Sequence, residues 1–233
     1  MSTLKYSNQV TSRVLPFALF MAFIGLEQGL RFLAGRELFT LSNTALYYLY
    51  PVKALSVAFL LYVFRKEYRE ISLKDLKNVP VTCAVCGIGL LVFTLWILMD
   101  WTFSVSGSPQ GFNPTLFPHP GVQLFMTLFR VGGAVLVVPL MEELFWRSFL
   151  IRYIIDPDFS GVPLGCFTWA SFLVTSLMFG LEHHFILAGI MAGISYNLIL
   201  YRTRSLIQCV LAHAVTNLAL ALYVISTGKW QFW

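Results

Sequence analysis

Two adjacent glutamates and an arginine lie inside a long apolar stretch of this chain. Glu142 and Glu143 directly follow an apolar run, and Arg147 comes four residues after Glu143. An ionisable group at the centre of a membrane helix costs about 2.5–3.5 kcal/mol on insertion scales, so such groups generally mark a function. Residues four apart share one helix face, whereas neighbours point about 100° apart. We therefore expect Glu143 to pair with Arg147, which leaves Glu142 as a tunable carboxyl suited to a general base.

Two histidine segments further along the chain have similar apolar surroundings. His183 follows Phe179 by four residues and shares its face, whereas His184 points about 100° away, so only one of the two should face a site. His213 and Asn217 are also four apart and can point into one cavity. Carboxylate, imidazole and amide groups from three helices could hold a water molecule, activate it and stabilise an oxyanion. Each segment alone also has a structural explanation, such as a buried ion pair or a hydrogen-bonded histidine.

The composition is that of a polytopic membrane protein. The chain of 233 residues is 58% hydrophobic and 12% charged, whereas soluble domains have about 45–50% apolar and about 25% charged residues. The net charge of +5 arises from basic residues at the ends of apolar runs, so orientation in a membrane explains it better than nucleic acid, and we expect no nucleic-acid partner. Cys83 and Cys86 form a C-x-x-C without a second half, and we interpret them as small buried helix residues.

Seven apolar runs approach or exceed the roughly 20 residues that a spanning helix needs. They cover residues 14–34, 45–64, 79–101, 122–155, 164–183, 185–201 and 205–226. The fourth run would be about 50 Å long as a helix, so it should be tilted, kinked at Pro139 or split into two helices. The sequence predicts an all-α polytopic bundle of seven to eight transmembrane helices that forms a single membrane-embedded domain, 1–233.

Basic residues give the expected orientation of the bundle. They concentrate in the amphipathic segment 65–78 and in a tight turn at Arg202 and Arg204. Residues 102–120, in contrast, form a Pro-rich loop without Lys, Arg, Asp or Glu. Placing both basic segments on the cytoplasmic side puts the N-terminus inside and the neutral loop outside. Seven spans satisfy this arrangement, and eight do not.

The expected helix starts place the polar groups at different depths. At 1.5 Å per residue, Glu142, His183 and His213 would lie about 20, 28 and 12 Å from the cytoplasmic ends of their helices. Tilt, kinks at Pro139 and Pro163, or a re-entrant element must bring them to one level if they form a site.

Three motifs, in this order, resemble those of the CPBP family, which includes the type II CAAX prenyl endopeptidases, intramembrane glutamic proteases. They are Glu142-Glu143-x-x-x-Arg147, Phe179-x-x-x-His183 and His213-x-x-x-Asn217. The resemblance covers about 139–218 and implies a mostly helical intramembrane fold. It implies that Glu142 and His183 activate the water, that His213 and Asn217 form the oxyanion site, and that Glu143 and Arg147 support it, with no cofactor and no metal.

The leading hypothesis is an intramembrane endopeptidase that uses a glutamate- and histidine-activated water. Its partners would be membrane lipids and a membrane-tethered peptide or protein C-terminal tail, of CAAX type or of a sorting-signal type that ends in a membrane span and a basic cluster. A zinc-dependent membrane hydrolase using His183, His213 and a carboxylate is an alternative, although H-E-x-x-H is missing. A transporter or a non-catalytic scaffold is a third possibility, but no paired repeat is visible.

Several other membrane residues have simpler interpretations. Glu27 and Arg31, four apart, are expected to form a structural pair, and Glu182 and His184 to reach a helix-end interface. Glu182 also differs from the residue expected before the motif histidine and would add a carboxylate if a metal were bound. Two small-residue motifs predict close helix packing, namely Gly25-x-x-x-Gly29 and Gly189-x-x-x-Gly193.

Overall fold

The computed structural model describes residues 3–42, 44–99 and 111–233, which form helices and no strand. The α-helices outside the fourth run are α1 (Thr3–Gly35), α2 (Leu49–Val63), α3 (Val79–Leu98), α7 (Trp169–Leu181), α8 (Ile186–Thr203) and α9 (Leu206–Thr227). A further helical run comprises α4 (Pro120–Gly132), η5 (Gly133–Val137), α5 (Val138–Glu143), η6 (Leu144–Leu150) and α6 (Ile151–Ile155). Short 3₁₀ turns connect them, namely η1 (Ala45–Tyr48), η2 (Arg65–Glu67), η3 (Leu73–Lys77), η4 (Pro114–Leu116), η7 (Phe159–Gly161) and η8 (Trp230–Phe232).

The fourth run is one continuous helical element from Pro120 to Ile155 and does not split at Pro139. Two of its segments, η5 and η6, are π-helical. A π-helix adds a residue to the turn, and such bulges occur frequently at functional sites. The structure therefore supports seven helical passes rather than eight.

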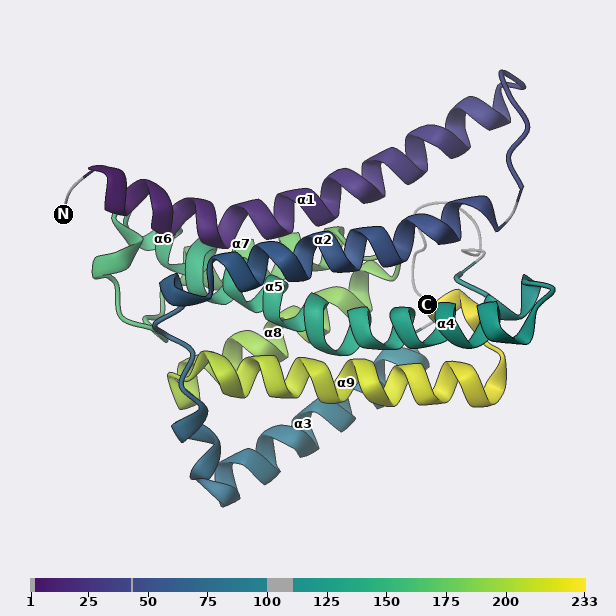
Figure 1. Ribbon diagram of the computed structural model, residues 1–233. Coiled ribbons are helices and arrows are strands. Elements are labelled where there is room, and N and C mark those ends of the chain that lie inside the picture. Colours follow the sequence, from purple (N-terminus) through teal and green to yellow (C-terminus); the bar gives the residue numbers. More distant parts are fainter. Residues whose placement is uncertain (1–2, 43, 100–110) are drawn as a thin grey trace.

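The passes alternate between the two ends of the bundle (Figure 1). Six helices, counting the fourth run as one, are long and apolar enough to cross a membrane, and α7 is apolar but has only 13 residues. The predicted class, an all-α membrane bundle, is thus confirmed. At 1.5 Å per residue, α7 spans about 20 Å, less than the roughly 30 Å of a hydrocarbon core.

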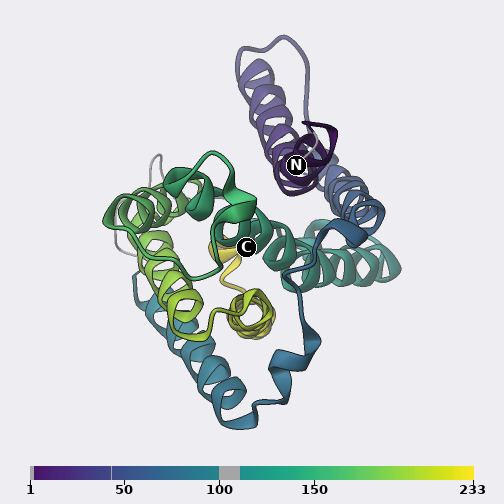
Figure 2. The same ribbon diagram turned by 90° about the vertical axis from the view of Figure 1, so that its left-hand side faces the viewer.

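α9 lies in the interior of the bundle, between α3, α8 and the central run (Figure 2). α1 packs along α2, and its C-terminal half extends away from the other helices (Figure 1). Glycines explain the tight contact between α7 and α8, because a Cβ on Gly189 would lie 2.8 Å from the Cα of Gly180. The packing predicted for Gly189 and Gly193 is confirmed. The close helix packing predicted for Gly25 and Gly29 is wrong: a Cβ on either residue would have no described atom within 4 Å.

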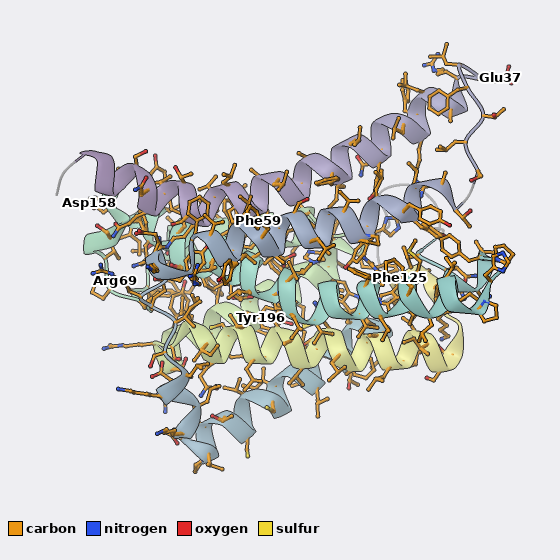
Figure 3. All side chains as sticks on the ribbon, viewed as in Figure 1. Glu37, Phe59, Arg69, Phe125, Asp158 and Tyr196 are labelled. Atoms are coloured by element: carbon orange, nitrogen blue, oxygen red, sulfur yellow. The ribbon has the colours of Figure 1, made fainter. Side chains whose placement is uncertain are left out.

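Both basic segments lie at the same end of the bundle as the N-terminus, as predicted. Lys74 and Asp75 of η3 line one surface pocket together with Arg202 and Arg204. The Ser205 hydroxyl donates to Asp75 Oδ2 at 2.5 Å and links the start of α9 to this loop. Figure 3 shows Arg69 and Asp158 at this end and Glu37 at the opposite end. Of the neutral loop at 102–120, residues 102–110 lie outside the described part.

The ion pair predicted within α1 is wrong. Glu27 Oε1 lies 3.3 Å from Lys53 Nζ of α2, and no Glu27–Arg31 pair occurs in the described structure. Lys53 is only 4% exposed, so the carboxylate on the neighbouring helix offsets a charge that would otherwise be buried unpaired. This pair links α1 to α2.

Candidate active site

Glu143 and Arg147 form the predicted ion pair, with 3.0 Å between Oε1 and Nη1. Glu143 is 0% and Arg147 1% exposed. Arg147 Nε also donates to Asn197 Oδ1 at 3.1 Å and Nη2 to the carbonyl of Gly193 at 3.3 Å, so the guanidinium ties the central run to α8. Its carbon Cζ lies 4.4 Å from the ring centroid of Phe179 on α7. Arg147 therefore joins three elements of the site.

Asn197 extends this buried network to α7. Its Nδ2 donates to the hydroxyls of Thr175 and Ser176, at 3.0 Å in each case. Sequence reasoning missed Asn197, although an amide in the middle of an apolar helix is the kind of signal that could have identified it. The side chains of Arg147, Thr175, Ser176 and Asn197 are all buried. The hydrogen bonds between them compensate for the loss of hydration.

His213 lies between the two glutamates. Its Nδ1 is 3.0 Å from Glu143 Oε1, and its Nε2 is 3.9 Å from Glu142 Oε2. The ring also stacks on Tyr196, with 4.8 Å between centroids and an interplanar angle of 23°; Figure 3 shows Tyr196 near the centre of the bundle. A proton on Nδ1 that is donated to Glu143 fixes the ring so that Nε2 faces Glu142. The link from Glu143 to His213 joins separate helices and was not predicted.

Glu142 projects away from the ion pair, as the helix geometry predicts. The residue is 6% exposed, and its Oε2 has no hydrogen-bond partner among the described residues. One ligand atom each from Glu142, Glu182 and His183 lie within 4.8 Å of one another. The carboxylate of Glu142 thus has an oxygen free to accept a proton or to bind a ligand.

His183 and Glu182 follow the C-terminal end of α7. His183 Nδ1 is 2.6 Å from the carbonyl of Phe179, which orients the ring with Nε2 free. Glu182 accepts a hydrogen bond from Trp146 Nε1 at 3.1 Å, and its second oxygen is buried without a partner among the described atoms. Glu182 lines the central cavity, so placing it at a helix-end interface was wrong. His184 does not line that cavity, in agreement with the predicted phase.

Asn217 faces the cavity from α9. Its Nδ2 donates to the carbonyl of Ala134 at 2.7 Å, and Ala134 belongs to the π-helical segment η5. One amide hydrogen satisfies this carbonyl, which leaves the second hydrogen available to a ligand. The π-helix therefore helps to orient a side chain that the sequence assigned to the site.

The late start of α7 explains how the polar groups reach one level. Gly165 has φ +74°, and the Thr168 hydroxyl caps the helix by accepting from the Ser171 amide at 3.2 Å, so α7 begins at Trp169 rather than at residue 164. Counted from Trp169, His183 lies about 21 Å along its helix, close to the roughly 20 Å of Glu142 counted from residue 155.

α9 reaches the same level because it begins inside the protein. Leu206, its first residue, is 0% exposed, and the preceding Ser205 is bonded to Asp75. The first turn of α9 is thus covered by η3, which places His213 deeper than a helix start at the surface would. The kink expected at Pro139 is not required.

A cavity of about 350 Å³ connects these side chains. Glu142, His183, His213 and Asn217 line it, whereas Glu143 and Arg147 lie behind its wall. The volume is within the roughly 300–1,000 Å³ typical of ligand pockets. Residues of α1, α2 and α3 also contribute to the lining, among them Phe20, Lys53 and Trp96.

The donor set around Glu142 fits a divalent cation in type. Carboxylate oxygens and imidazole nitrogens are ligands of Zn²⁺ and related metals. The three residues that come together are Glu142, Glu182 and His183, whereas His213 has its Nδ1 bonded to Glu143. The zinc ligand set predicted with both histidines is therefore not the one that the structure assembles.

A helical membrane protein whose internal cavity gathers carboxylate, imidazole and amide groups has the make-up of an intramembrane hydrolase. Residues 122–219 match the family model described as type II CAAX prenyl endopeptidase Rce1-like. The match covers the three motifs, agrees with the resemblance to the CPBP family over this region, and supports a CAAX-type intramembrane protease at the level of the family. No curated protein and no solved structure matches the chain.

Proposed function

We propose that this protein is an intramembrane glutamic endopeptidase with Glu142 as its general base. The observation that carries the proposal is the unpartnered oxygen of Glu142, which faces a cavity beside His183 and His213. A buried carboxylate with one free oxygen can accept a proton from a water molecule. Glu182 also keeps an unpartnered oxygen, but its other oxygen accepts from Trp146 Nε1, whereas Glu142 lies beside both histidines.

In the proposed reaction, Glu142 and His183 Nε2 hold a water molecule between them. Glu142 accepts a proton from this water while the oxygen attacks the scissile carbonyl, and the tetrahedral intermediate carries the negative charge on the former carbonyl oxygen. Collapse of the intermediate breaks the C–N bond, and Glu142 returns the proton to the leaving amine. Protons and electrons balance without a further reactant.

The oxyanion would be stabilised by Asn217 and His213. The second amide hydrogen of Asn217 is not used by Ala134. When His213 is doubly protonated, its Nδ1–H bonds Glu143 and its Nε2–H can donate to the oxyanion, because the ring is already fixed by the 3.0 Å contact. Preorganised donors of this kind each contribute about 10²–10³ in rate.

The substrate in this proposal is a membrane-tethered peptide or a protein C-terminal tail. The lining of the cavity combines apolar side chains such as Phe20 and Ile24 with the polar groups at Glu142, which suits an extended peptide in a lipid environment. Because α1, α2 and α3 complete the cavity, we also propose that 1–233 forms one membrane-embedded domain around the catalytic region 139–218.

The test is peptide cleavage by purified protein in liposomes. Wild type should cleave a quenched fluorescent peptide that carries a lipid anchor, and Glu142→Gln should not. His184→Ala is the matched control, because this histidine lies next to the site and does not line its cavity. A Glu142→Gln variant that retains wild-type turnover would overturn the proposed role.

A metal-dependent hydrolase is the second candidate, favoured by the grouping of Glu142, Glu182 and His183 within 4.8 Å. A bound Zn²⁺ would supply a Lewis acid and lower the pKa of a bound water. Elemental analysis of the purified protein separates the candidates, since one zinc per chain that is lost in Glu182→Gln together with activity would support the metal.

A further inference from the structure

A second pocket lies at the end of the bundle that carries both basic segments. It has a volume of about 470 Å³ and lies between η3 and the turn that joins α8 to α9. Its basic side chains are Lys74, Arg202 and Arg204, and Asp75 is the only carboxylate among the described residues that line it. The peptidase mechanism proposed above uses none of these residues. This basic pocket therefore needs an explanation of its own.

The basic pocket has a surplus of positive charge. Lys74, Arg202 and Arg204 form no ion pair within the described part of the chain, whereas the Asp75 carboxylate accepts a hydrogen bond from Ser205 at 2.5 Å. Three cations and one carboxylate leave a net charge of +2. Ser205 precedes α9 and its side chain does not cap the helix, so the positive end of the helix adds to the same field. This charge favours an anionic ligand.

Gln208 gives a second requirement for the ligand. It is 1% exposed, and its Nε2 donates to the carbonyl of Asp75 at 3.1 Å and to Thr82 Oγ1 at 2.9 Å. Because a backbone carbonyl can only accept, these bonds fix the orientation of the amide. Its Oε1 is buried without a partner among the described atoms, which is costly. Since Gln208 lines the pocket, a ligand with an O–H or N–H group can satisfy this oxygen.

The position of the pocket favours a lipid over a soluble anion. α8 ends at Thr203, α9 begins at Leu206 and α3 begins at Val79, and all three helices are long and apolar enough to cross a membrane. α3 lies at the outer edge of the bundle (Figure 2) and exposes apolar side chains along its length, among them Val79, Leu90 and Leu91. A headgroup in the pocket would leave its acyl chains free to lie along such a surface. Basic pockets at the cytoplasmic ends of membrane helices bind anionic headgroups.

We propose that the basic pocket binds an anionic phosphodiester that carries a hydroxyl group, as in the headgroup of phosphatidylglycerol. The phosphate contacts the guanidinium groups of Arg202 and Arg204, which suit phosphate because they can form two parallel N–H···O bonds. The hydroxyl donates to Gln208 Oε1. A lipid bound in this way links η3 to the turn before α9. The site is separate from the catalytic cavity and does not depend on the proposed peptidase function.

The test measures binding of phosphatidylglycerol with a fluorescent acyl chain to the purified full chain in a zwitterionic detergent, by fluorescence anisotropy. Unlabelled phosphatidylglycerol should displace this probe at an about fivefold lower concentration than phosphatidylmethanol, a difference expected for about one hydrogen bond. The two lipids have the same charge, but phosphatidylmethanol lacks a hydroxyl in its headgroup. Equal displacement by both would overturn the proposed site, because only general attraction of anionic lipids to a basic surface would remain.

Variants separate the pocket from its basic surroundings. Arg204→Gln should weaken binding of the probe about tenfold, through loss of a charge-assisted hydrogen bond, and Arg204→Lys should retain part of the affinity. Lys77→Gln is the matched control, because it removes the same charge from η3 but does not line the pocket. Equal weakening by Arg204→Gln and Lys77→Gln would contradict the proposal. The comparison of the two lipids on wild type remains decisive even if Arg204→Gln does not fold.

A third competitor distinguishes a lipid from a soluble source of the same phosphodiester. Glycerophosphoglycerol is the polar part of phosphatidylglycerol without acyl chains. It should not displace the probe at a concentration at which phosphatidylglycerol displaces it fully, because the acyl chains contribute contacts with the apolar surface of α3. Full displacement at that concentration would assign the pocket to a soluble phosphodiester and overturn its role as a lipid site.

Discussion

The two glutamates of the central run belong to environments that differ in how completely their hydrogen bonds are satisfied. Glu143 Oε1 contacts both Arg147 and His213, and Arg147 continues to Asn197 on α8. Glu142 has a free oxygen and faces Glu182, which also has a free oxygen. Neighbouring residues in sequence thus contribute to a saturated network behind the cavity and to an unsaturated cluster inside it. We infer that the saturated network around Glu143 holds the helices rigidly together, whereas the unsaturated cluster around Glu142 is available for chemistry.

The largest effect is expected from exchanging the two glutamates for glutamine one at a time. Glu142→Gln is nearly isosteric and removes the proposed base, so turnover should fall by about 10²–10⁴ while the melting temperature in detergent changes little. Glu143→Gln should unfold at lower temperature, because loss of one partner from a buried ion pair costs about 3–5 kcal/mol. A stable, inactive Glu143→Gln beside a destabilised Glu142→Gln would reverse the two roles.

Glu143→Gln should also lose activity, because the amide no longer provides the carboxylate that orients His213. Replacing Glu143 and Arg147 together by neutral residues should recover stability relative to Glu143→Gln alone, since no unpaired cation remains buried. Activity should not recover in that double variant. Melting temperature and cleavage rate of the three proteins separate support of the fold from support of the histidine.

The histidines extend the comparison to the other helices. His183→Ala and His213→Ala should abolish measurable cleavage, because one removes the water ligand and the other an oxyanion donor, while both proteins fold. His184→Ala should keep most of the activity. Cleavage rates and melting curves provide the measurement. An equal loss of activity in His183→Ala and His184→Ala would show that the assignment of His183 to the cavity and of His184 away from it is wrong.

Two asparagines should respond in opposite ways. Asn217→Ala removes an oxyanion donor from the cavity side, so the rate should fall by about 10²–10³, while the loss of its single hydrogen bond to Ala134 should cost only about 0.5–1.5 kcal/mol. Asn197→Ala leaves Arg147 and two hydroxyls short of a buried partner, which should cost about 1–3 kcal/mol of unfolding free energy. Kinetics and thermal unfolding of both variants test the contrast, which fails if Asn197→Ala melts like wild type.

The smallest effect is expected from removal of metal. The proposed reaction uses only groups of the protein, so strong chelation should leave the cleavage rate unchanged. Glu182→Gln should retain most of the activity for the same reason. Loss of activity on chelation, restored by Zn²⁺, would replace the glutamic mechanism with the metal-dependent one.

Local geometry was predictable from the sequence, and contacts between helices were less so. The Glu143–Arg147 pair and the divergence of His183 from His184 follow from helical periodicity alone. The link from Glu143 to His213 joins residues 70 apart, and the partner of Glu27 lies on α2 rather than one turn away. Periodicity gives the direction of a side chain on its own helix, but the packing of helices decides which group it meets.

Helix starts show the same limit. The apolar run 164–183 predicted a helix from about 164. α7 instead begins at Trp169, because Gly165 has a positive φ and Thr168 caps the helix. Those five residues removed most of the calculated mismatch in depth between Glu142 and His183. The π-helical segments were not predicted either, and one of them contains Ala134, whose carbonyl accepts from Asn217 of another helix.

The short α7 has a consequence for the surrounding lipid. A helix of 13 residues, about 20 Å long, is hydrophobically mismatched to a bilayer core of about 30 Å. Lipids beside a short span thin locally at a modest free-energy cost. The headgroup region would then approach His183, so that bilayer thickness controls how readily water reaches the proposed catalytic groups. Liposomes made from lipids of increasing acyl-chain length would show this as a progressive fall in cleavage rate.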